Sequence, residues 1–118
     1  MKTSKERVVP YITRDGSTVR ELMHPSVHGN YQQSLAEARV KPGCITRLHK
    51  HRLTEELYHV ISGAGLITLG TEVLQMKAGD TICISPGTVH CVENTEKQDL
   101  VFLCCCSPAY SHKDTKLL

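Results

Sequence analysis

Three histidines and one glutamate are spaced so that their side chains could hold one metal ion. His49 and His51 are two residues apart, and residues two apart on a β-strand point to the same face. Glu56 follows after a short turn and can return on the next strand as an oxygen ligand. His90 lies farther along, just after a Ser-Pro-Gly sequence. Three imidazoles and one carboxylate suit manganese, iron, nickel, zinc or copper, and suit magnesium or calcium poorly.

Glycine residues frame these four side chains in two separate blocks of the sequence. The first block, from Gly43 to Gly63, reads G-x5-H-x-H-x4-E-x6-G. The second, from Gly79 to Asn94, reads G-x5-S-x-G-x2-H-x3-N. Both blocks resemble the two metal-binding motifs of the cupin superfamily, and the chain is similar to its small single-domain members. One position departs from the family pattern, because Ser85 stands where proline is usual.

The resemblance implies an all-β fold, the double-stranded β-helix or jelly-roll barrel of cupins. It also implies one divalent transition metal held by four ligands, which are His49, His51, Glu56 and His90. Glu55 is the competing carboxylate, since the family tolerates three or four residues before its glutamate. Glu56 is preferred because six residues separate it from Gly63.

The elements that must position these residues are short strands joined by tight turns. Segments rich in Val, Ile, Leu, Thr and Cys alternate with Gly and Pro, a pattern typical of all-β folds. We expect strands at 18–23, 33–40, 44–51, 56–61, 65–69, 72–76, 81–85, 89–94 and 100–106. Glu37–Lys41 and Lys50–Leu57 could instead form short helical turns. The segments Gly63–Gly65 and Gly70–Thr71 are predicted to be hairpin turns, because glycine accepts a positive φ without strain.

A chain of 118 residues has the size of one domain. We divide it into an N-terminal segment (1–32), a cupin barrel (33–106) and a C-terminal tail (107–118). The resemblance implies a homodimer, to which strands of the N-terminal segment would contribute. The tail is polar and has no strand pattern, so it is expected to cross the domain as a loop or to fray.

Four further residues are candidates for lining the cavity around the metal, and we take them as tentative catalytic groups: Tyr58, Cys104, Tyr110 and His112. On the predicted last strand, Phe102, Cys104 and Cys106 share one face. The simpler alternatives are a core tyrosine, cysteines that pack as small hydrophobic residues, and a tail that is mobile or contacts a second chain. For Cys105 and Cys106 we favour this alternative and expect core residues, whereas Cys104 stays open between core and cavity.

Composition excludes several other functions. The formal net charge is +2 and only five aromatic residues are present, which argues against nucleic acid as a partner. No apolar run approaches the length of a membrane span. Neither a secretory signal nor a zinc-knuckle cysteine pair is present, so we expect a cytoplasmic protein with six reduced cysteines.

Two adjacent open positions on the metal would favour a small, oxygen-bearing, chelating substrate, including anionic ones: a sugar, a sugar acid or a hydroxy acid. The first hypothesis is a metal-dependent enzyme that uses Lewis-acid isomerase or lyase chemistry. An iron or copper dioxygenase is the second, and nearby thiols argue weakly against it because a reactive oxidant would oxidise them. A non-catalytic cupin that binds or senses a small molecule is the third.

Overall fold

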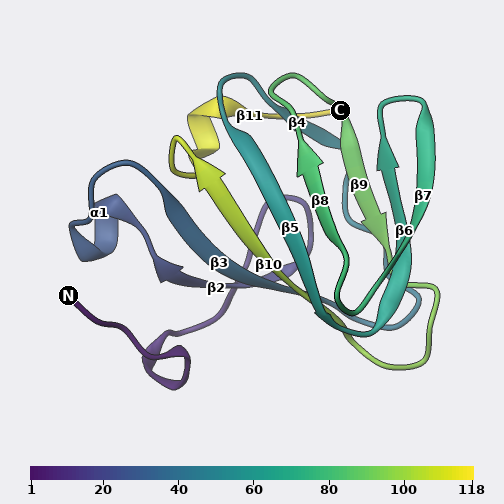
Figure 1. Ribbon diagram of the computed structural model, residues 1–118, viewed down its shortest axis with the longest axis horizontal. Helices are drawn as coiled ribbons and strands as arrows, with labels where there is room; N and C mark the ends of the chain where they lie inside the picture. The colour runs from purple at the N-terminus through teal and green to yellow at the C-terminus, as the bar shows by residue number, and fades with distance from the viewer.

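The computed structural model describes all residues, 1–118, and consists of two antiparallel β-sheets that face each other (Figure 1). One sheet has six strands in the order β1-β2-β3-β10-β5-β8, and the other has five in the order β11-β4-β9-β6-β7. The strands of the six-stranded sheet are β1 (Tyr11–Ile12), β2 (Thr18–Met23), β3 (Ser34–Val40), β10 (Leu100–Ser107), β5 (Glu55–Ser62) and β8 (Thr81–Ile84). Those of the five-stranded sheet are β11 (Thr115–Leu117), β4 (His49–His51), β9 (His90–Glu93), β6 (Ala64–Leu69) and β7 (Glu72–Lys77). The predicted all-β class and the two-layered barrel are therefore confirmed.

Helical structure is confined to three short pieces. They are two 3-10 turns, η1 (Lys5–Arg7) and η2 (His112–Asp114), and one short helix, α1 (Pro25–His28). Helical turns within 37–41 and 50–57 were the alternative to strands there, and they do not form. Residues of those segments lie in β3, β4 and β5, because burial of one face favours the extended chain. No helix is long and apolar enough to cross a membrane.

Alternation along the strands buries one face of each sheet. In β5, Glu56, Tyr58 and Val60 are buried while the residues between them are exposed, as the period of two residues requires. The inner faces meet in one apolar core, formed by Val19, Ala36, Ala38, Val40, Tyr58, Val60, Ile67, Met76, Ile84, Val92, Leu100 and Phe102. This core fixes the distance between the sheets and therefore between the side chains that each sheet contributes.

Glycines occur both in a hairpin turn and in a connection between the two sheets. Gly70 lies between β6 and β7, which pair with each other, so the predicted hairpin there is confirmed. Gly63 connects β5 to β6, which belong to different sheets, so the hairpin predicted at Gly63–Gly65 is wrong. Gly63 has a φ of +84°, and a Cβ there would lie 2.5 Å from the carbonyl oxygen of Asp99. Only glycine fits such a crossing between sheets.

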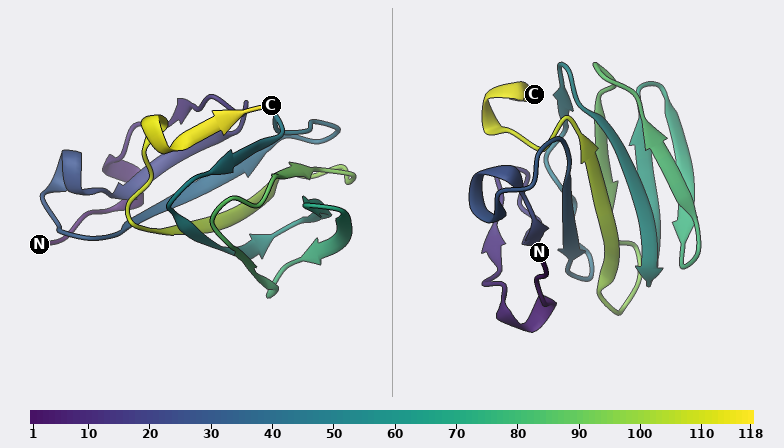
Figure 2. Two further views of the ribbon diagram at one scale, coloured as in Figure 1. Left: turned by 90° about the horizontal axis from the view of Figure 1, so that it is seen from above. Right: turned by 60° about the vertical axis from the view of Figure 1, so that its left-hand side comes forward.

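Both ends of the chain are part of the folded structure. The N-terminal segment supplies β1 and β2, and β2 pairs with β3. The tail supplies β11, which pairs with β4, so the expectation of a tail without strand structure is wrong. In the right-hand view of Figure 2, the N-terminal segment and the C-terminal tail lie along the same edge of the molecule. The strand expected at 44–51 is reduced to β4, although Ile45 forms one bridge to Glu93.

Candidate metal centre

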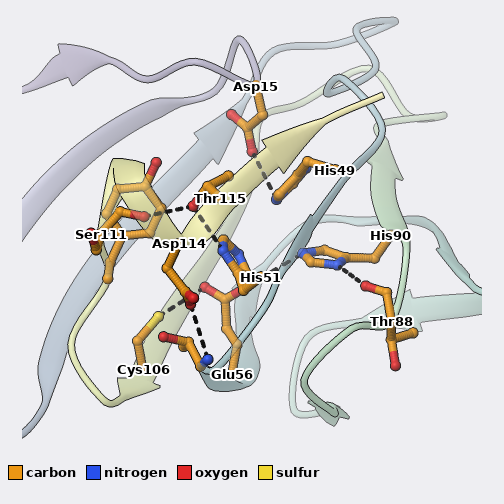
Figure 3. A network of polar contacts seen from close by, with 12 residues as sticks. Asp15, His49, His51, Glu56, Thr88, His90, Cys106, Ser111, Asp114 and Thr115 are labelled. Atoms are coloured by element: carbon orange, nitrogen blue, oxygen red, sulfur yellow. Dashed lines mark hydrogen bonds and ion pairs between the residues drawn. The ribbon is translucent and has the colours of Figure 1, made fainter.

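The four residues expected to bind metal come from both sheets and meet in the interior (Figure 3). His49 and His51 share the inner face of β4, and His49 is the direct cross-strand partner of His90 at the start of β9. Glu56 reaches toward them from β5 of the other sheet. Each of the four is at most 4% exposed. Pairing of β4 with β9 and the core between the sheets thus gather the side chains.

The distances are those of a compact cluster. One ring nitrogen from each of His49, His51 and His90 lies within 4.8 Å of the other two. Oε1 of Glu56 lies 3.3 Å from Nε2 of His51 and 3.6 Å from Nε2 of His90. A three-histidine group that could bind a metal ion is therefore present.

Hydrogen bonds that Nδ1 donates orient the three imidazoles. Nδ1 of His49 is 2.8 Å from the carbonyl of Arg47, and Nδ1 of His90 is 2.9 Å from the carbonyl of Thr88. A carbonyl only accepts, so both Nδ1 atoms carry the proton and donate. Both Nε2 atoms are then left with a free lone pair, the form in which histidine binds metals.

Nδ1 of His51 is held by a side chain from the tail. It lies 2.9 Å from Oγ1 of Thr115, and that hydroxyl donates its own proton to the carbonyl of Ser111 at 2.8 Å. The threonine oxygen must therefore accept from His51, which leaves Nε2 of this ring unprotonated as well. All three rings thus have the same tautomer.

Two buried atoms at the centre of this cluster lack a hydrogen-bond partner. They are Oε1 of Glu56 and Nε2 of His90. A carboxylate oxygen facing the lone pairs of imidazole nitrogens is unfavourable unless a cation lies between them. A divalent ion would satisfy both atoms at once. A ligand set of three imidazole nitrogens and one carboxylate oxygen suits a transition metal. The residues present therefore fit the metal that the motifs imply.

Ionisation of the cluster is compatible with metal binding. Burial alone would raise the pKa of Glu56, whereas hydrogen bonds donated by His51 and His90 would lower it to about 2, and a cation held in place of those protons would act in the same direction. Burial, followed by the neighbouring His90, lowers the pKa of His49. The carboxylate is thus ionised and that imidazole is neutral, as metal ligation requires.

The Glu56 carboxylate also accepts a hydrogen bond from a residue that was expected only to pack in the core. The thiol of Cys106 donates to Oε2 of Glu56 at 3.1 Å. Burial and the negative charge of Glu56 raise the pKa of this thiol, so it remains a donor. Cys106 therefore fixes one carboxylate oxygen while the other faces the histidines.

A pocket of about 590 Å³, its open mouth included, is lined by three of the candidate ligands, His49, His51 and Glu56. Its apolar wall includes Val19, Ala36, Ala38 and Phe102. Residues of β1, β2 and the loop between them form part of its rim, and Tyr110, Thr115 and Leu117 of the tail form another part. Both ends of the chain therefore shape access to the candidate metal centre.

Three of the four tentative catalytic residues line this pocket. They are Tyr58, Cys104 and Tyr110. His112 does not line it, but its Nδ1 lies 3.0 Å from the hydroxyl of Tyr110. The expectation that Cys105 is a core residue is wrong, because the alternation of β10 directs it to the outer face, where it is half-buried. Cys106 is buried and lines the pocket.

Asp15 was not identified from the sequence, although it approaches the cluster closely. Its Oδ2 lies 3.9 Å from Nε2 of His49 (Figure 3). The backbone N–H of Arg47 donates to the carbonyl of Asp15 at 2.7 Å, which ties the loop before β2 to the segment before β4. No local pattern signals this contact, because it joins segments far apart in the chain.

Comparison with known proteins places the chain among cupins. A family model described as "Cupin domain" matches residues 36–106. The chain is 49% identical to an uncharacterized protein of Methanocaldococcus jannaschii over 118 residues, which cover 100% of this chain and 94% of that protein.

Solved structures share the same fold at lower identity. A predicted oxalate decarboxylase from Thermotoga maritima superimposes with a TM-score of 0.80 at 24% identity, over 92% of this chain and 99% of that one. The Streptomyces nucleoside dehydratase Pac13, also solved with uridine, gives 0.80 at 18% identity, over 100% of this chain and 90% of that one. At such identities the likeness shows the fold, a double-stranded β-helix.

Proposed function

The chain belongs to the cupin family, and from this premise we propose that it is a metal-dependent enzyme. Its metal is one divalent transition ion, bound by His49, His51, Glu56 and His90. Its substrate is a small, oxygen-bearing chelator such as a sugar, a sugar acid or a hydroxy acid, and the reaction is an isomerisation or a lyase step.

One observation carries this proposal. Oε1 of Glu56 and Nε2 of His90 are buried without a hydrogen-bond partner, 3.6 Å apart. Buried polar atoms nearly always have partners, and an exception needs an explanation. A bound cation explains both atoms, and it agrees with the tautomers that the hydrogen bonds to Nδ1 select.

A divalent ion held by His49, His51, Glu56 and His90 would supply Lewis acidity, the chemistry that isomerase and lyase reactions beside a carbonyl group need. The apolar side chains of Val19, Ala38 and Phe102 form part of the pocket wall, and a substrate packed against them would displace water from it. Exclusion of water strengthens electrostatic interactions within the site. The protein thus offers a pocket with a partly apolar wall, which also includes the candidate ligands His49, His51 and Glu56.

Tyr110 is suited to hold a substrate oxygen at the outer side of the ligands. Its ring meets that of His51 edge-on, with ring centroids 5.8 Å apart, and it lines the pocket. Its hydroxyl also contacts Nδ1 of the exposed His112. A proton could therefore pass between the substrate, Tyr110 and the solvent-facing imidazole.

The pocket favours non-redox chemistry over oxygen activation. Two thiols, Cys104 and Cys106, line it, and Cys106 touches the Glu56 carboxylate. An oxidant generated there would oxidise these sulfurs. Dioxygenase activity and ligand binding without turnover are the outcomes that the experiment must separate from isomerase or lyase activity.

Exchange of substrate protons with deuterated water tests the proposal. Protein stripped with a chelator and reloaded with each of manganese, iron, nickel, zinc and copper is incubated with hydroxy ketones, sugar acids and hydroxy acids. We expect metal-dependent exchange or product formation, followed by proton NMR. Glu56→Gln should abolish it, whereas the exposed neighbour variant Glu55→Gln should retain it.

Other results would point elsewhere. Oxygen consumption with an iron- or copper-loaded sample would establish a dioxygenase. Binding of a compound that is never converted would favour a sensing protein. Activity that survives complete metal removal would contradict the proposal.

A further inference from the structure

We propose that the pocket is built for a neutral ligand that carries hydroxyl groups, and that Asp15 and Glu21 bind those hydroxyls. Both carboxylates belong to the N-terminal hairpin, defined here as residues 11–23. The inference rests on the proposed function, because the other end of the ligand is bound at the metal. It narrows the substrate class from sugars and acids to neutral polyhydroxyl compounds.

The Asp15 carboxylate is fixed by hydrogen bonds to one of its oxygens, and its other oxygen has no hydrogen-bond partner. It lies in the loop between β1 and β2, and its carbonyl accepts from the N–H of Arg47. Its Oδ1 accepts from the backbone N–H of Ser17 at 2.9 Å and from the Ser17 hydroxyl at 2.7 Å. Oδ2 makes no such bond and lies 3.9 Å from Nε2 of His49. A hydrogen-bond acceptor is thus fixed beside the candidate metal ligands.

Glu21 also lines the pocket and has one oxygen without a partner. It lies on β2, whose alternation directs Val19 and Glu21 to the pocket side. The hydroxyl of Tyr11 donates to its Oε2 at 3.4 Å, while Oε1 is buried and unpartnered. Burial raises the pKa of this carboxyl, while the nearby His24 and the hydrogen bond from Tyr11 oppose the rise.

The free oxygens determine which groups a ligand must present. An ionised carboxylate only accepts hydrogen bonds, so each of these oxygens requires a donor from the ligand. Hydroxyl groups supply donors without adding charge. A ligand that binds the metal through one oxygen and places hydroxyls near the N-terminal hairpin would satisfy both ends of the pocket.

Charge in the pocket disfavours ligands with a second negative group. Beyond the ligand cluster, the pocket is lined by two carboxylates, Asp15 and Glu21, and by one permanently charged cation, Arg14. The Arg14 guanidinium is exposed, and Nη1 donates to the carbonyl of His112 at 3.3 Å. A phosphate placed beside two carboxylates would be repelled in a site of low dielectric constant.

Binding of a matched pair of probes tests the inference. Xylulose and its terminal phosphate ester are titrated calorimetrically into the metal-loaded protein, whose metal content is measured on the same sample. We expect xylulose to bind at least about tenfold more tightly than the ester, which corresponds to about 1.4 kcal/mol. Glu21→Gln and Asp15→Asn should each weaken xylulose binding and reduce that preference. Glu55→Gln, an exposed carboxylate outside the pocket, should change neither.

The outcomes separate this inference from the proposed function. If the metal-loaded protein binds the ester as tightly as xylulose, or binds no xylulose at millimolar concentration, the inference is overturned while the metal site stands. Tighter binding of an amino-substituted analogue than of xylulose would also overturn it, because the carboxylates would then select a cation. A protein that takes up no metal overturns both.

Discussion

At the scale of single residues, candidate metal ligands are oriented by hydrogen bonds to neighbouring side chains. Thr115 accepts from His51 and donates to the carbonyl of Ser111. Cys106 donates to Glu56. Such supporting contacts fix the tautomer and direction of metal ligands, and their loss commonly lowers metal affinity. The arrangement is therefore preorganised before a metal arrives.

Loss of the Cys106 thiol should destabilise the protein. Cys106→Ala removes the donor to a buried carboxylate oxygen, which costs about 1–3 kcal/mol for an unsatisfied group of this kind. Cys106→Ser keeps a donor and should recover part of that loss. Urea unfolding of metal-free samples measures the difference. Cys44→Ala is the matched control, because Cys44 is exposed and lies outside the strands. Equal stability of the two alanine variants would contradict the role given to Cys106.

The four candidate ligands were predictable because their types and spacing are local features of the sequence. His49 and His51 share a strand face, and the glycines that frame each block mark its turns. Thr115 and Cys106 were not predictable as supporting residues. Their contacts span 64 and 50 residues of sequence, and neither lies in a motif. Asp15 was not predictable either, because its contact with His49 also joins distant segments of the chain.

At the scale of elements, the tail stabilises the turn that joins two candidate ligands. The carboxylate of Asp114 accepts from the backbone N–H groups of Leu53 and Thr54, between His51 and Glu56. The hydroxyl of Thr54 donates to the carbonyl of Pro108 at 2.9 Å. Strand β11 then pairs with β4 along its length. The tail, residues 107–118, thus fixes the strand β4 and the turn that follows it.

Metal affinity should depend on the tail through Thr115. Thr115→Val has nearly the same shape but cannot accept from Nδ1 of His51, so affinity should fall by about 10–100-fold. Thr115→Ser keeps the hydroxyl and should stay close to the original protein. Competition with a chromophoric chelator measures both. Equal affinity of the valine and serine variants would show that the hydrogen bond does not position His51.

Each strand expected from the sequence has a counterpart in the structure, because alternation of apolar residues and glycine turns is encoded locally. The two strands that were missed, β1 and β11, have two and three residues. Each exists by pairing with a distant or longer neighbour, which single-sequence patterns do not reveal. The segment 44–48 has the composition of a strand but pairs at Ile45 alone.

At the scale of the whole molecule, the order of strands could not be read from the sequence. β10 pairs with both β3 and β5, and β9 pairs with β4 and β6. Family resemblance implied a double-stranded β-helix without the order of its strands, and composition alone indicated only a sandwich or barrel. The pocket composition, including the carboxylates of the N-terminal hairpin, depends on that topology.

The six-stranded sheet also presents an exposed apolar row to the outside. Cys105 pairs with Leu35 on one side and Leu57 on the other, and Leu57 pairs with Cys83. Leu35 and Leu57 are 37% and 39% exposed. Exposed apolar surface of this kind commonly marks an interface, and we predict that a second copy covers it in a homodimer.

Sedimentation at micromolar concentration tests the homodimer. The chain has a mass of 13.1 kDa, and a species of twice that mass is expected. Leu57→Glu should dissociate it, because a charge would be buried in the contact. Leu74→Glu, at an equally exposed position of the other sheet, should leave it intact. A monomeric native protein would contradict the prediction.

The most direct test of the central claim is elemental analysis of untagged protein, purified without a nickel column or a chelator. We predict close to one divalent transition metal per chain, drawn from manganese, iron, nickel, zinc and copper. His49→Ala should lose most of that metal while its circular dichroism spectrum remains that of a β protein. A native protein that is metal-free and takes up none of these ions when they are added, or a His49→Ala variant that retains its metal, would contradict the account.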